Sequence, residues 1–470
     1  MSDEKVLTLD ALHTLPPEWP EELLPGIREE IGKSKYKLVV LDDDPTGTQT
    51  VRDIPVLTHW SVDGLRDELK SDYPAFFILT NSRSLPKDQA CSLAREVGVN
   101  IKEASEGTGV RAIVISRSDS TLRGHFPVEV DATAKSLGKK NLPYLLIPFF
   151  LEGGRYTIGD VHYVREGTTL IPAAQTPFAR DAAFGFSQSN LKKYIEEKTS
   201  GAIPAEKVVS ISLEDIRIGG PKLVAEILKS VPHTSACCVN AVSYRDMEVL
   251  VTALLHVEND GYEFLYRTAA SFVRTRTGLD ENAGLLTGAE LINGSNHGGL
   301  FVIGSYVPKT TSQVSALLEQ TDVVPIEVNV SSLLTTGKKD EEVKRVVRES
   351  TEMLESGRDA AIYTSRELVT GKNATESLKI GDAISRSLVE IVSELPIKPR
   401  YLVAKGGITS SDVATKALNI RRAMVIGQAL PGVPAWRLGG ETPYPGMTYI
   451  VFPGNVGDDD ALVQLQRNLK

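Results

Sequence analysis

The chain has 470 residues, of which 41% are hydrophobic and 24% are charged, and its formal net charge is -9. This length exceeds one ordinary core, so two domains of a few hundred residues each are expected. The acidic balance argues against a general nucleic-acid-binding surface, which needs a clustered basic field. No apolar run approaches the roughly 18 residues of a membrane span, so no membrane partner is expected.

Cysteine usage and the N-terminus indicate a reducing compartment. The chain holds three cysteines, Cys91, Cys237 and Cys238, and two of them are adjacent, a spacing that rarely forms a disulfide. The first residues are acidic and interrupted by proline, without the basic start and apolar core of a signal peptide. A cytoplasmic location is therefore predicted.

Short apolar runs alternate with amphipathic segments in the first half. Buried strands are predicted at 37–41, 75–80, 111–116 and 143–150, and helical spacing covers 87–106. Runs rich in Val, Ile and Phe with helices between them are typical of parallel sheets, so the first half is predicted to be an α/β domain. Residues 151–181 are rich in Gly, Thr and Pro and lack a sustained period, which predicts a lid or binding loop.

A second α/β series begins near residue 299. Its predicted strands lie within 299–307, 322–330, 358–366, 400–405, 423–430 and 448–453. The domain boundary is expected between about 243 and 299, and we set it at 250, giving domains of 1–250 and 251–470. The proline-punctuated segment 1–36 is expected to form an ordered arm on the surface of the first domain.

Polar and charged residues follow the predicted strands of the first half. In open α/β sheets ligands bind at the carboxyl ends of the strands, so these residues are candidate ligand contacts. They are Asp42, Asp43, Asp44, Thr46 and Gly47 after the first strand, Asn81, Ser82 and Arg83 after the second, and Arg117, Ser118, Asp119, Ser120, Thr121 and Arg123 after the third. Carboxylates can accept hydroxyl protons and arginines can bind a carboxylate or phosphate, a combination that suits a small polyhydroxylated acid. Structural ion pairs, for example of Asp43 and Arg123, are the alternative interpretation.

Glycines follow the strands of the second half instead. They are Gly304 beside Ser305, Gly406 and Gly407 before Ile408 and Thr409, Gly427, Gly432 after Pro431, and Gly454 to Gly457. Glycine lets backbone N–H groups approach a phosphate, and a helix that begins beside it adds a favourable dipole. The second half therefore predicts a nucleotide site, although each pair taken alone is more typical of a turn. Neither GxxxxGK[ST] nor GxGxxG after a strand occurs, which excludes the two commonest nucleotide motifs.

Other site classes find little support. The seven histidines show no HExxH spacing, the cysteines form no CxxC, and no GxSxG occurs, so neither a protein-held metal nor a hydrolase serine is predicted. His125 and His162 fall in the polar loops of the first half, where a surface or structural role is the simpler interpretation.

The motifs resemble those of the four-carbon acid sugar kinase family. "DDDPTGTQT", "TNSRSL", "SRSDSTLRGHFPVEVDA", "GGRYTIGDVHYV", "FVIGSYVPKTTSQV", "KGGITSSDVA" and "FPGNVGDDDAL" occur in that family's order from about Leu38 to the C-terminus. The resemblance implies an ATP-dependent kinase that phosphorylates the terminal hydroxyl of a 3-oxo-tetronate, D-threonate or D-erythronate. It implies two α/β domains, the N-terminal one binding the sugar acid and the C-terminal one the nucleotide, with an active-site cleft between them.

The resemblance also implies site residues. The implied substrate site comprises Asp43, Asp44, Arg83, Arg117, Ser118, Asp119, Ser120 and Arg123, and the implied ATP site comprises Ser305, Gly406, Gly407, Ile408, Thr409 and Gly454. One of Asp43 and Asp44 would orient the hydroxyl, Arg83 or Arg123 would bind the carboxylate, and Mg²⁺ would accompany the phosphates. Closure of the two domains would then bring the hydroxyl into line, and a homodimer is the expected assembly.

Two departures from the family pattern concern the substrate. Pro45 stands where the family has a small or apolar residue, and Arg117 stands where many members have lysine. A branched acid such as 3-oxoisoapionate is therefore an alternative substrate. A sugar-acid or nucleotide sensor without catalysis is the alternative from another class, and the lack of GxGxxG weighs against an oxidoreductase.

Overall fold

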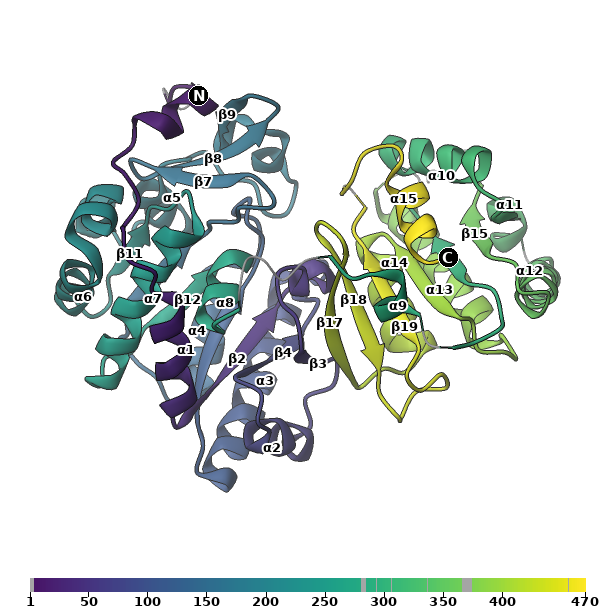
Figure 1. The fold of residues 1–470 in the computed structure, drawn as a ribbon, viewed down its shortest axis with the longest axis horizontal. Helices are drawn as coiled ribbons and strands as arrows, with labels where there is room; N and C mark the ends of the chain where they lie inside the picture. The colour runs from purple at the N-terminus through teal and green to yellow at the C-terminus, as the bar shows by residue number, and fades with distance from the viewer. Residues whose placement is uncertain are drawn as a thin grey trace. The chain divides into compact units, whose positions relative to one another are not determined.

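The computed structural model describes residues 4–279, 285–292, 294–305, 307–335, 337–365, 374–454 and 456–470. The chain divides into two compact units (Figure 1). The first consists of Met1–Val51 and His59–Ala283, and the second of Arg52–Thr58 and Gly284–Lys470. Both combine helices with a mainly parallel sheet, so the predicted fold class of two α/β domains is confirmed.

A parallel sheet forms the core of the first unit, with strand order β10-β11-β6-β12-β5-β2-β4. Its strands are β2 (Tyr36–Asp42), β4 (Ala75–Leu79), β5 (Arg111–Arg117), β6 (Tyr144–Ile147), β10 (Val209–Ile211), β11 (Ala236–Val239) and β12 (Leu265–Thr268). The four runs predicted from the sequence became β2, β4, β5 and β6. The side chains of β4 and β11 are buried throughout, as expected for strands covered on both faces.

Helices of the first unit pack in two groups. One contains α2 (Val62–Lys70), α3 (Lys87–Thr108) and α4 (Val128–Ser136), and the other contains α1 (Leu24–Lys33), α6 (Gly220–Ser230), α7 (Tyr244–Asn259) and α8 (Ala270–Arg276). α5 (Leu191–Lys198) packs near β11. The N-terminal arm joins the second group, because α1 lies against α7 and Arg28 Nε donates to the carbonyl of Gly278 at 2.8 Å.

The segment expected to be a lid or binding loop is a small antiparallel sheet. Its order is β1-β9-β8-β7, with β1 (Leu7–Thr8), β7 (Arg155–Ile158), β8 (Val161–Glu166) and β9 (Thr169–Pro172). A two-residue turn joins β7 to β8, and both Gly159 and Asp160 have positive φ, the conformation that a tight hairpin needs. The glycines that suggested an irregular loop are therefore hairpin residues.

The second unit has a mixed sheet of order β3-β17-β18-β19-β16-β13-β15-β14. The strands are β3 (Ile54–Leu57), β13 (Leu300–Ile303), β14 (Val324–Val328), β15 (Ala360–Thr364), β16 (Tyr401–Lys405), β17 (Arg422–Leu430), β18 (Val433–Leu438) and β19 (Thr448–Phe452). Pairing is parallel from β19 to β14 and antiparallel from β3 to β19. Gly432 belongs to the hairpin turn between β17 and β18, and Gly427 lies inside β17 at an irregularity, so neither marks a parallel strand end.

Helices α9 (Gly288–Leu291), α10 (Pro308–Gln320), α11 (Val330–Leu333), α12 (Lys339–Glu355), α13 (Ala374–Ser393), α14 (Gly407–Asp412) and α15 (Ala461–Asn468) complete the second unit. α10 packs against α15, and α12 against α13. The core under them contains Phe301, Val403, Ile450 and Leu462, all fully buried.

The division between the units differs from the boundary set at residue 250. That position falls inside α7, and β12, further along the chain, pairs between β5 and β6 in the first sheet. The structure divides the chain after Ala283, inside the broader interval of 243–299. The four-residue strand β12 was not recognised because it is too short to show a period of its own.

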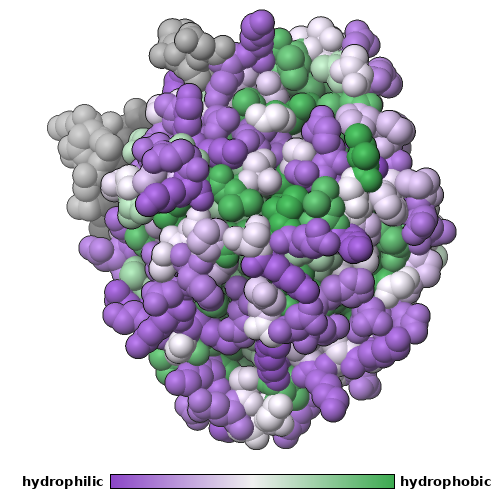
Figure 2. All heavy atoms as spheres, turned by 90° about the vertical axis from the view of Figure 1, so that its left-hand side faces the viewer, coloured by the Kyte–Doolittle hydropathy of each residue, from purple (hydrophilic) through white to green (hydrophobic). Residues whose placement is uncertain are grey.

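The surface agrees with the acidic, charged composition. Figure 2 shows one face of the molecule, where hydrophilic residues predominate and hydrophobic residues form limited patches between them. Among the described residues, no helix combines the length and the apolar character needed to cross a membrane.

A buried carboxylate joins several elements at the amino end of the second sheet. Asp359, just before β15, accepts hydrogen bonds from the backbone N of Gly299 at 2.7 Å and from the hydroxyl of Tyr401 at 2.8 Å. It also pairs with Arg400 at 3.0 Å and accepts from Gln466 of α15 at 3.1 Å. One side chain therefore connects β13, β15, β16 and the C-terminal helix.

We predict that Asp359→Ala destabilises the second unit by about 3 to 5 kcal/mol, because it leaves buried donors and a guanidinium without their acceptor. Urea unfolding followed by circular dichroism measures the effect. The matched control is Asp322→Ala, since the Asp322 side chain is 71% exposed and its partners among the described residues are the exposed Lys470 and, at 3.5 Å, Gln466. The control should change stability by less than about 1 kcal/mol. Equal effects of the two substitutions would contradict the role of Asp359.

Candidate functional site

The first carboxylate of the Asp42–Asp44 run is part of the framework. Asp42 is the last residue of β2 and lies opposite Arg117, the last residue of β5, with an ion pair of 3.1 Å between them. Asp42 is 1% exposed, and burial raises its pKa to about 7 even though Arg117 favours its charged form. A Cβ at Gly47 would overlap the Asp42 carboxyl group, so only glycine fits there. Arg117, predicted as a substrate contact, is therefore held by Asp42.

Asp44 is fixed by local contacts. Its Oδ1 accepts from the backbone N of Thr46 at 2.9 Å and from the Thr46 hydroxyl at 2.5 Å, which caps the 3-10 turn η2 (Pro45–Thr48). Its Oδ2 lies 2.5 Å from Nη2 of Arg83. Burial alone would raise the pKa of Asp44, but the Arg83 charge and the bonds from Thr46 outweigh it and lower the pKa.

Asp43 is more deeply buried than Asp44 and keeps a free oxygen. Its Oδ2 accepts a hydrogen bond from the hydroxyl of Ser118, and its Oδ1 lies 3.8 Å from Nη2 of Arg83, beyond hydrogen-bond distance. Oδ1 has no hydrogen-bond partner among the described residues, although Asp43 is only 4% exposed. A buried carboxylate oxygen without a donor is costly, so this atom is a ready acceptor for a ligand hydroxyl.

Arg83, in the 3-10 turn η3 (Ser82–Ser84) that follows β4, extends the network to Asp119. Nη1 of Arg83 lies 3.4 Å from Asp119 Oδ1, and Nε of Arg123 donates to Asp119 Oδ2 at 2.7 Å. Burial opposes ionisation of Asp119, but the charges of Arg83 and Arg123 overcome it and lower the pKa of Asp119. Arg123 also pairs with Asp181 at 3.6 Å. The structure thus brings Asp43, Asp44, Arg83, Asp119 and Arg123 into one network.

Ser120 is not part of this charge network, and its backbone carbonyl contacts His162 instead. Its carbonyl oxygen is 2.7 Å from Nε2 of His162, and Nδ1 of that histidine lies 2.9 Å from the Thr157 hydroxyl. Burial lowers the pKa of His162 to about 4, so the ring is neutral at pH 7. The histidine therefore fixes the loop after β5 from the small antiparallel sheet, which agrees with a structural interpretation.

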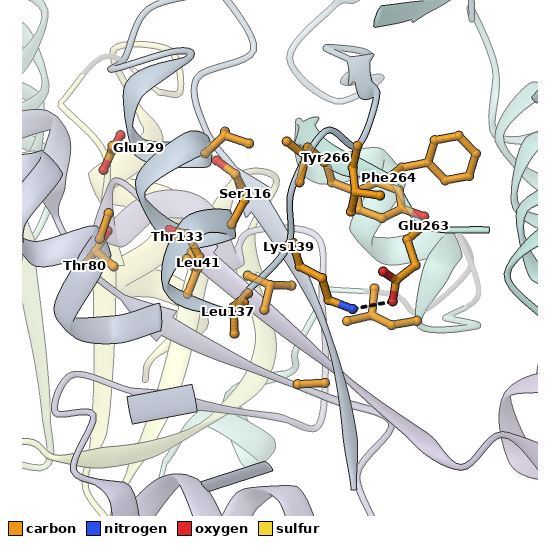
Figure 3. Close-up of a pocket in the computed structure, with 18 of the residues that line it drawn as sticks. Leu41, Thr80, Ser116, Glu129, Thr133, Leu137, Lys139, Glu263, Phe264 and Tyr266 are labelled. Atoms are coloured by element: carbon orange, nitrogen blue, oxygen red, sulfur yellow. Dashed lines mark hydrogen bonds and ion pairs between the residues drawn. The ribbon is translucent and has the colours of Figure 1, made fainter. Parts of the chain in front are cut away.

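An apolar pocket lies beneath α4, and Asp43 belongs to its lining. Figure 3 shows Glu129, Thr133 and Leu137 of α4 along one wall and Tyr266 of β12 on another. Asp43, Thr80, Ser82 and Glu129 line its polar end, and the Lys139–Glu263 ion pair lies elsewhere in its lining. Burial raises the pKa of Glu129 to about 7, and the charge of Asp43 adds to the effect.

Two residues of this neighbourhood were missed from the sequence. Glu129 stands inside a helix rather than after a strand, so inspecting strand ends does not find it. Arg267 is the penultimate residue of β12, and its Nη2 donates to the carbonyl of Arg123 at 2.6 Å. A search of every strand end would have found Arg267, had the short run 265–268 been recognised as a strand.

In the second unit three glycines meet at the carboxyl ends of neighbouring parallel strands. Gly304 follows β13, Gly406 follows β16 and Gly454 lies just beyond β19. Gly406 has φ of +112°, and a Cβ on Gly454 would lie 4.0 Å from the Gly406 Cα. A Cβ on Gly304 would overlap the hydroxyl of Thr409. The three strand ends therefore approach one another closely, and backbone without side chains at such a place suits phosphate oxygens.

The remaining predicted cofactor residues surround these glycines. Thr310 of α10 contacts both the Ser305 hydroxyl and the Gly454 carbonyl at 3.3 Å. Gly407, Ile408 and Thr409 form the first turn of α14, where Thr409 is buried and Ile408 is 65% exposed. Asn455, part of the same glycine-rich stretch in the sequence, lies outside the described residues.

Lys405 is a further residue of this site that the sequence did not single out. It ends β16, directly before Gly406, and is fully buried. Its Nζ donates to the carbonyl of Pro453 at 3.2 Å and lies 4.0 Å from the ring centre of Phe452. Burial, with the charge of Lys309, lowers the pKa of Lys405 to about 7.

Both halves of the chain match family models of known proteins. A family model described as a sugar-binding N-terminal domain matches residues 38–276, and one described as a nucleotide-binding C-terminal domain matches 300–462. No curated protein matches.

Two solved structures share the fold. A "putative tRNA synthase" from Salmonella typhimurium LT2 has a TM-score of 0.67 at 16% identity. Haemophilus influenzae protein HI1011 has a TM-score of 0.63 at 18% identity. Each alignment covers 92% of this chain and 100% of the other, and at these identities the likeness concerns the fold alone. The two family models, in this order along one chain, show that the protein belongs to the four-carbon acid sugar kinase family.

Proposed function

We propose that the protein transfers the γ-phosphate of ATP to the terminal hydroxyl of a four-carbon acid sugar of the 3-oxo-tetronate, D-threonate or D-erythronate type. The observation that carries the proposal is the unpartnered Oδ1 of Asp43, buried beside Arg83 in the sugar-binding unit. Such an oxygen can accept the proton of a substrate hydroxyl. The nucleotide-binding unit supplies the other half of the reaction.

The contacts favour Asp43 over Asp44 as the residue that orients the hydroxyl. Both oxygens of Asp44 are engaged, one by Thr46 and the other by Arg83. Asp43 needs only one oxygen for Ser118 and leaves the second for a ligand. Asp44 then acts as a positioning residue, because it holds the guanidinium of Arg83 next to Asp43.

The charges around Asp43 suit phosphoryl transfer. The reaction needs positioning and charge neutralisation more than covalent participation by the protein. Ser118 and Arg83 contact Asp43 from two sides and hold the carboxylate in one orientation. A hydroxyl bound to Oδ1 would therefore be aligned without further movement of this side chain.

The strand-end glycines of the second unit support ATP as the donor. Around Gly454 the nearest atom to an added Cβ is the Gly406 Cα at 4.0 Å, so a phosphate oxygen could approach the backbone at this position. The exposed side chain of Ile408 offers an apolar surface that a purine ring could cover. Thr310 adds a hydroxyl at the N-terminal turn of α10.

The residues present fit a Mg²⁺ ion carried mainly by the nucleotide. Among the described residues no three His, Cys, Asp or Glu side chains are grouped to hold a metal. Mg²⁺ in kinases typically keeps several waters and binds substrate phosphates with only one or two carboxylates, so a closed protein cage is not required. The ion would neutralise phosphate charge during transfer.

Lys405 is expected to oppose stability at neutral pH. A buried ammonium without a carboxylate partner costs free energy, and Lys405 contacts the carbonyl of Pro453 and the ring of Phe452. The folded pKa of about 7 lies below the ordinary lysine value of about 10.4, so protonation is disfavoured by folding. A position that costs stability is commonly kept for function, and here it lies beside Gly406.

The first prediction concerns the two carboxylates. Asp43→Asn should lower kcat by roughly 10²- to 10⁴-fold, because the amide cannot take the hydroxyl proton. Asp44→Asn should act less on kcat and more on stability, since it weakens the cap of η2 and the pair with Arg83. Coupled ADP release with a panel of four- and five-carbon acid sugars measures turnover, and calorimetry measures ATP binding, which should persist in both variants.

The same assay separates the proposal from its alternatives. A protein that binds acid sugars or ATP but releases no ADP with any acid is a sensor, and the proposed function then fails. If only a branched acid is turned over, the proposed reaction stands and the proposed substrate is replaced by that acid. Near-normal kcat of Asp43→Asn would transfer the orienting role to another residue.

The second prediction concerns the pH dependence of Lys405. Between about pH 7 and 10 the unfolded lysine carries a proton that the folded lysine has released, so its contribution to the free energy of unfolding rises with pH. Lys405→Met removes this contribution and should be more stable than wild type at pH 6, by an amount that shrinks toward pH 10. Urea unfolding at several pH values tests this, with the exposed Lys416→Met as control. Parallel pH profiles of wild type and Lys405→Met would contradict the prediction.

A further inference from the structure

We propose that Arg155 binds the carboxylate of the acid sugar, in place of Arg83 or Arg123. The inference rests on the proposed function for the identity of the ligand, but its test is a binding measurement. Arg155 is the first residue of β7, in the small antiparallel sheet of the sugar-binding unit.

Arg155 is in no ion pair within the described part of the chain, although the charges of Asp119 and Glu166 act on it from further away. Among the described residues no carboxylate lies within ion-pair distance of its guanidinium, and its buried Nε has no hydrogen-bond partner. Its Nη1 donates to the carbonyl of Gly153, two residues earlier. Burial lowers the pKa of Arg155, whereas a bound carboxylate would have the opposite effect. A half-buried guanidinium with spare donors is suited to a bidentate carboxylate contact.

Arg83, Arg117 and Arg123 are already in ion pairs, whereas Arg267 donates to the carbonyl of Arg123. Arg83 contacts Asp44 and Asp119, Arg117 pairs with Asp42, and Arg123 contacts Asp119 and Asp181. A ligand carboxylate could take one of these guanidiniums only by competing with a buried acidic partner. Stripping such a partner leaves a buried charge uncompensated, which costs several kcal/mol. Binding at Arg155 requires no such exchange.

Arg155 also lies at the end of the network that contains Asp43. The guanidiniums of Arg123 and Arg155 both lie over the ring of Phe178, at 5.1 and 5.6 Å from its centre. Arg123 contacts Asp119, Asp119 contacts Arg83, and Arg83 lies beside Asp43. A free acceptor for a hydroxyl therefore lies at Asp43, and a cation that can bind a carboxylate lies at Arg155, over the ring that it shares with Arg123. An acid sugar carries the same two groups at its opposite ends.

This arrangement gives Arg155 a role in specificity. A neutral polyol of the same length offers a hydroxyl to Asp43 but nothing to neutralise Arg155. A hydrogen bond to a charged group contributes about 1.5 to 3 kcal/mol, which corresponds to roughly 10- to 100-fold in affinity. Arg155 should therefore account for a preference of that size for acids over polyols.

The test compares wild type with Arg155→Gln, Arg155→Lys and the control Arg165→Gln. Arg165 is an exposed arginine of the neighbouring strand β8, and its side chain donates a hydrogen bond to the Gly167 carbonyl. Titration calorimetry without nucleotide measures binding of D-erythronate and D-threonate, and of erythritol and threitol as neutral counterparts. We expect Arg155→Gln to bind both acids roughly 10- to 100-fold more weakly, with unchanged polyol binding. Arg155→Lys should retain part of the acid affinity, and Arg165→Gln should match wild type.

The outcomes for this inference and for the proposed function can be told apart. Wild-type acid affinity in Arg155→Gln overturns the inference, whether or not the protein releases ADP. Equal losses for acids and polyols, or failure of wild type to bind any acid, also overturn it. Circular dichroism guards against misfolding, and removal of an unpaired buried cation should not lower stability. Absence of ADP release with intact, Arg155-dependent acid binding would reject the kinase proposal and leave the inference standing.

Discussion

The guanidinium of Arg83 is the interaction on which the candidate substrate site depends. It lies within 4 Å of Asp43, Asp44 and Asp119, which come from the loops after two different strands. Burial would raise the pKa values of Asp44 and Asp119, and the charge of Arg83 is the largest effect that lowers them. Arg83 therefore favours the ionised form of both carboxylates and also lies beside Asp43. The parallel pairing of β2 with β4 makes this possible, because it brings the ends of both strands to one edge of the sheet.

Two glycines allow the charged groups to come this close. Gly47 lies so near the Asp42 carboxyl group that no side chain fits. Gly124 has φ of +116°, and a Cβ there would lie 2.7 Å from the Ser118 hydroxyl and 3.1 Å from Asp43 Oδ2. The turn around Ser118 therefore needs glycine for both its backbone conformation and its space. The tight turns allow the charged side chains to approach, and the contacts of those side chains in turn hold the turns in place.

The sequence predicted the parts of the site that lie directly after long apolar runs. Asp43, Asp44, Arg83 and Asp119 were identified because a buried parallel strand shows an unbroken apolar run and its end is then known within a residue or two. Partners were not predictable in the same way: that Arg117 pairs with Asp42 depends on the register of β2 and β5. The fold class was likewise evident from the alternation of apolar and amphipathic segments.

The residues that sequence analysis missed share a physical cause. Glu129 is distant in sequence from Asp43 and reaches the same pocket only through the packing of α4. Arg155 lies in the segment 151–181, whose glycines suggest an irregular loop in the sequence. The structure shows instead a hairpin with its turn at 159–160. Lys405 directly precedes Gly406 and Gly407, and only the two glycines were identified from the sequence. The burial of the lysine side chain is seen only in the three-dimensional structure. Contacts that depend on tertiary packing leave no periodic signal in the chain.

The two units of the protein offer different kinds of groups to a ligand. The first unit presents charged side chains, each held by partners from another strand or helix, and such fixed groups can distinguish one small acid from another. The second unit presents backbone at glycines, which suits phosphate groups that all nucleotides share. Selectivity for the acceptor should therefore reside in the first unit. Within it, Asp43 and Arg155 each have a polar atom without a hydrogen-bond partner among the described residues, and a ligand that satisfies both must carry a hydroxyl and a carboxylate.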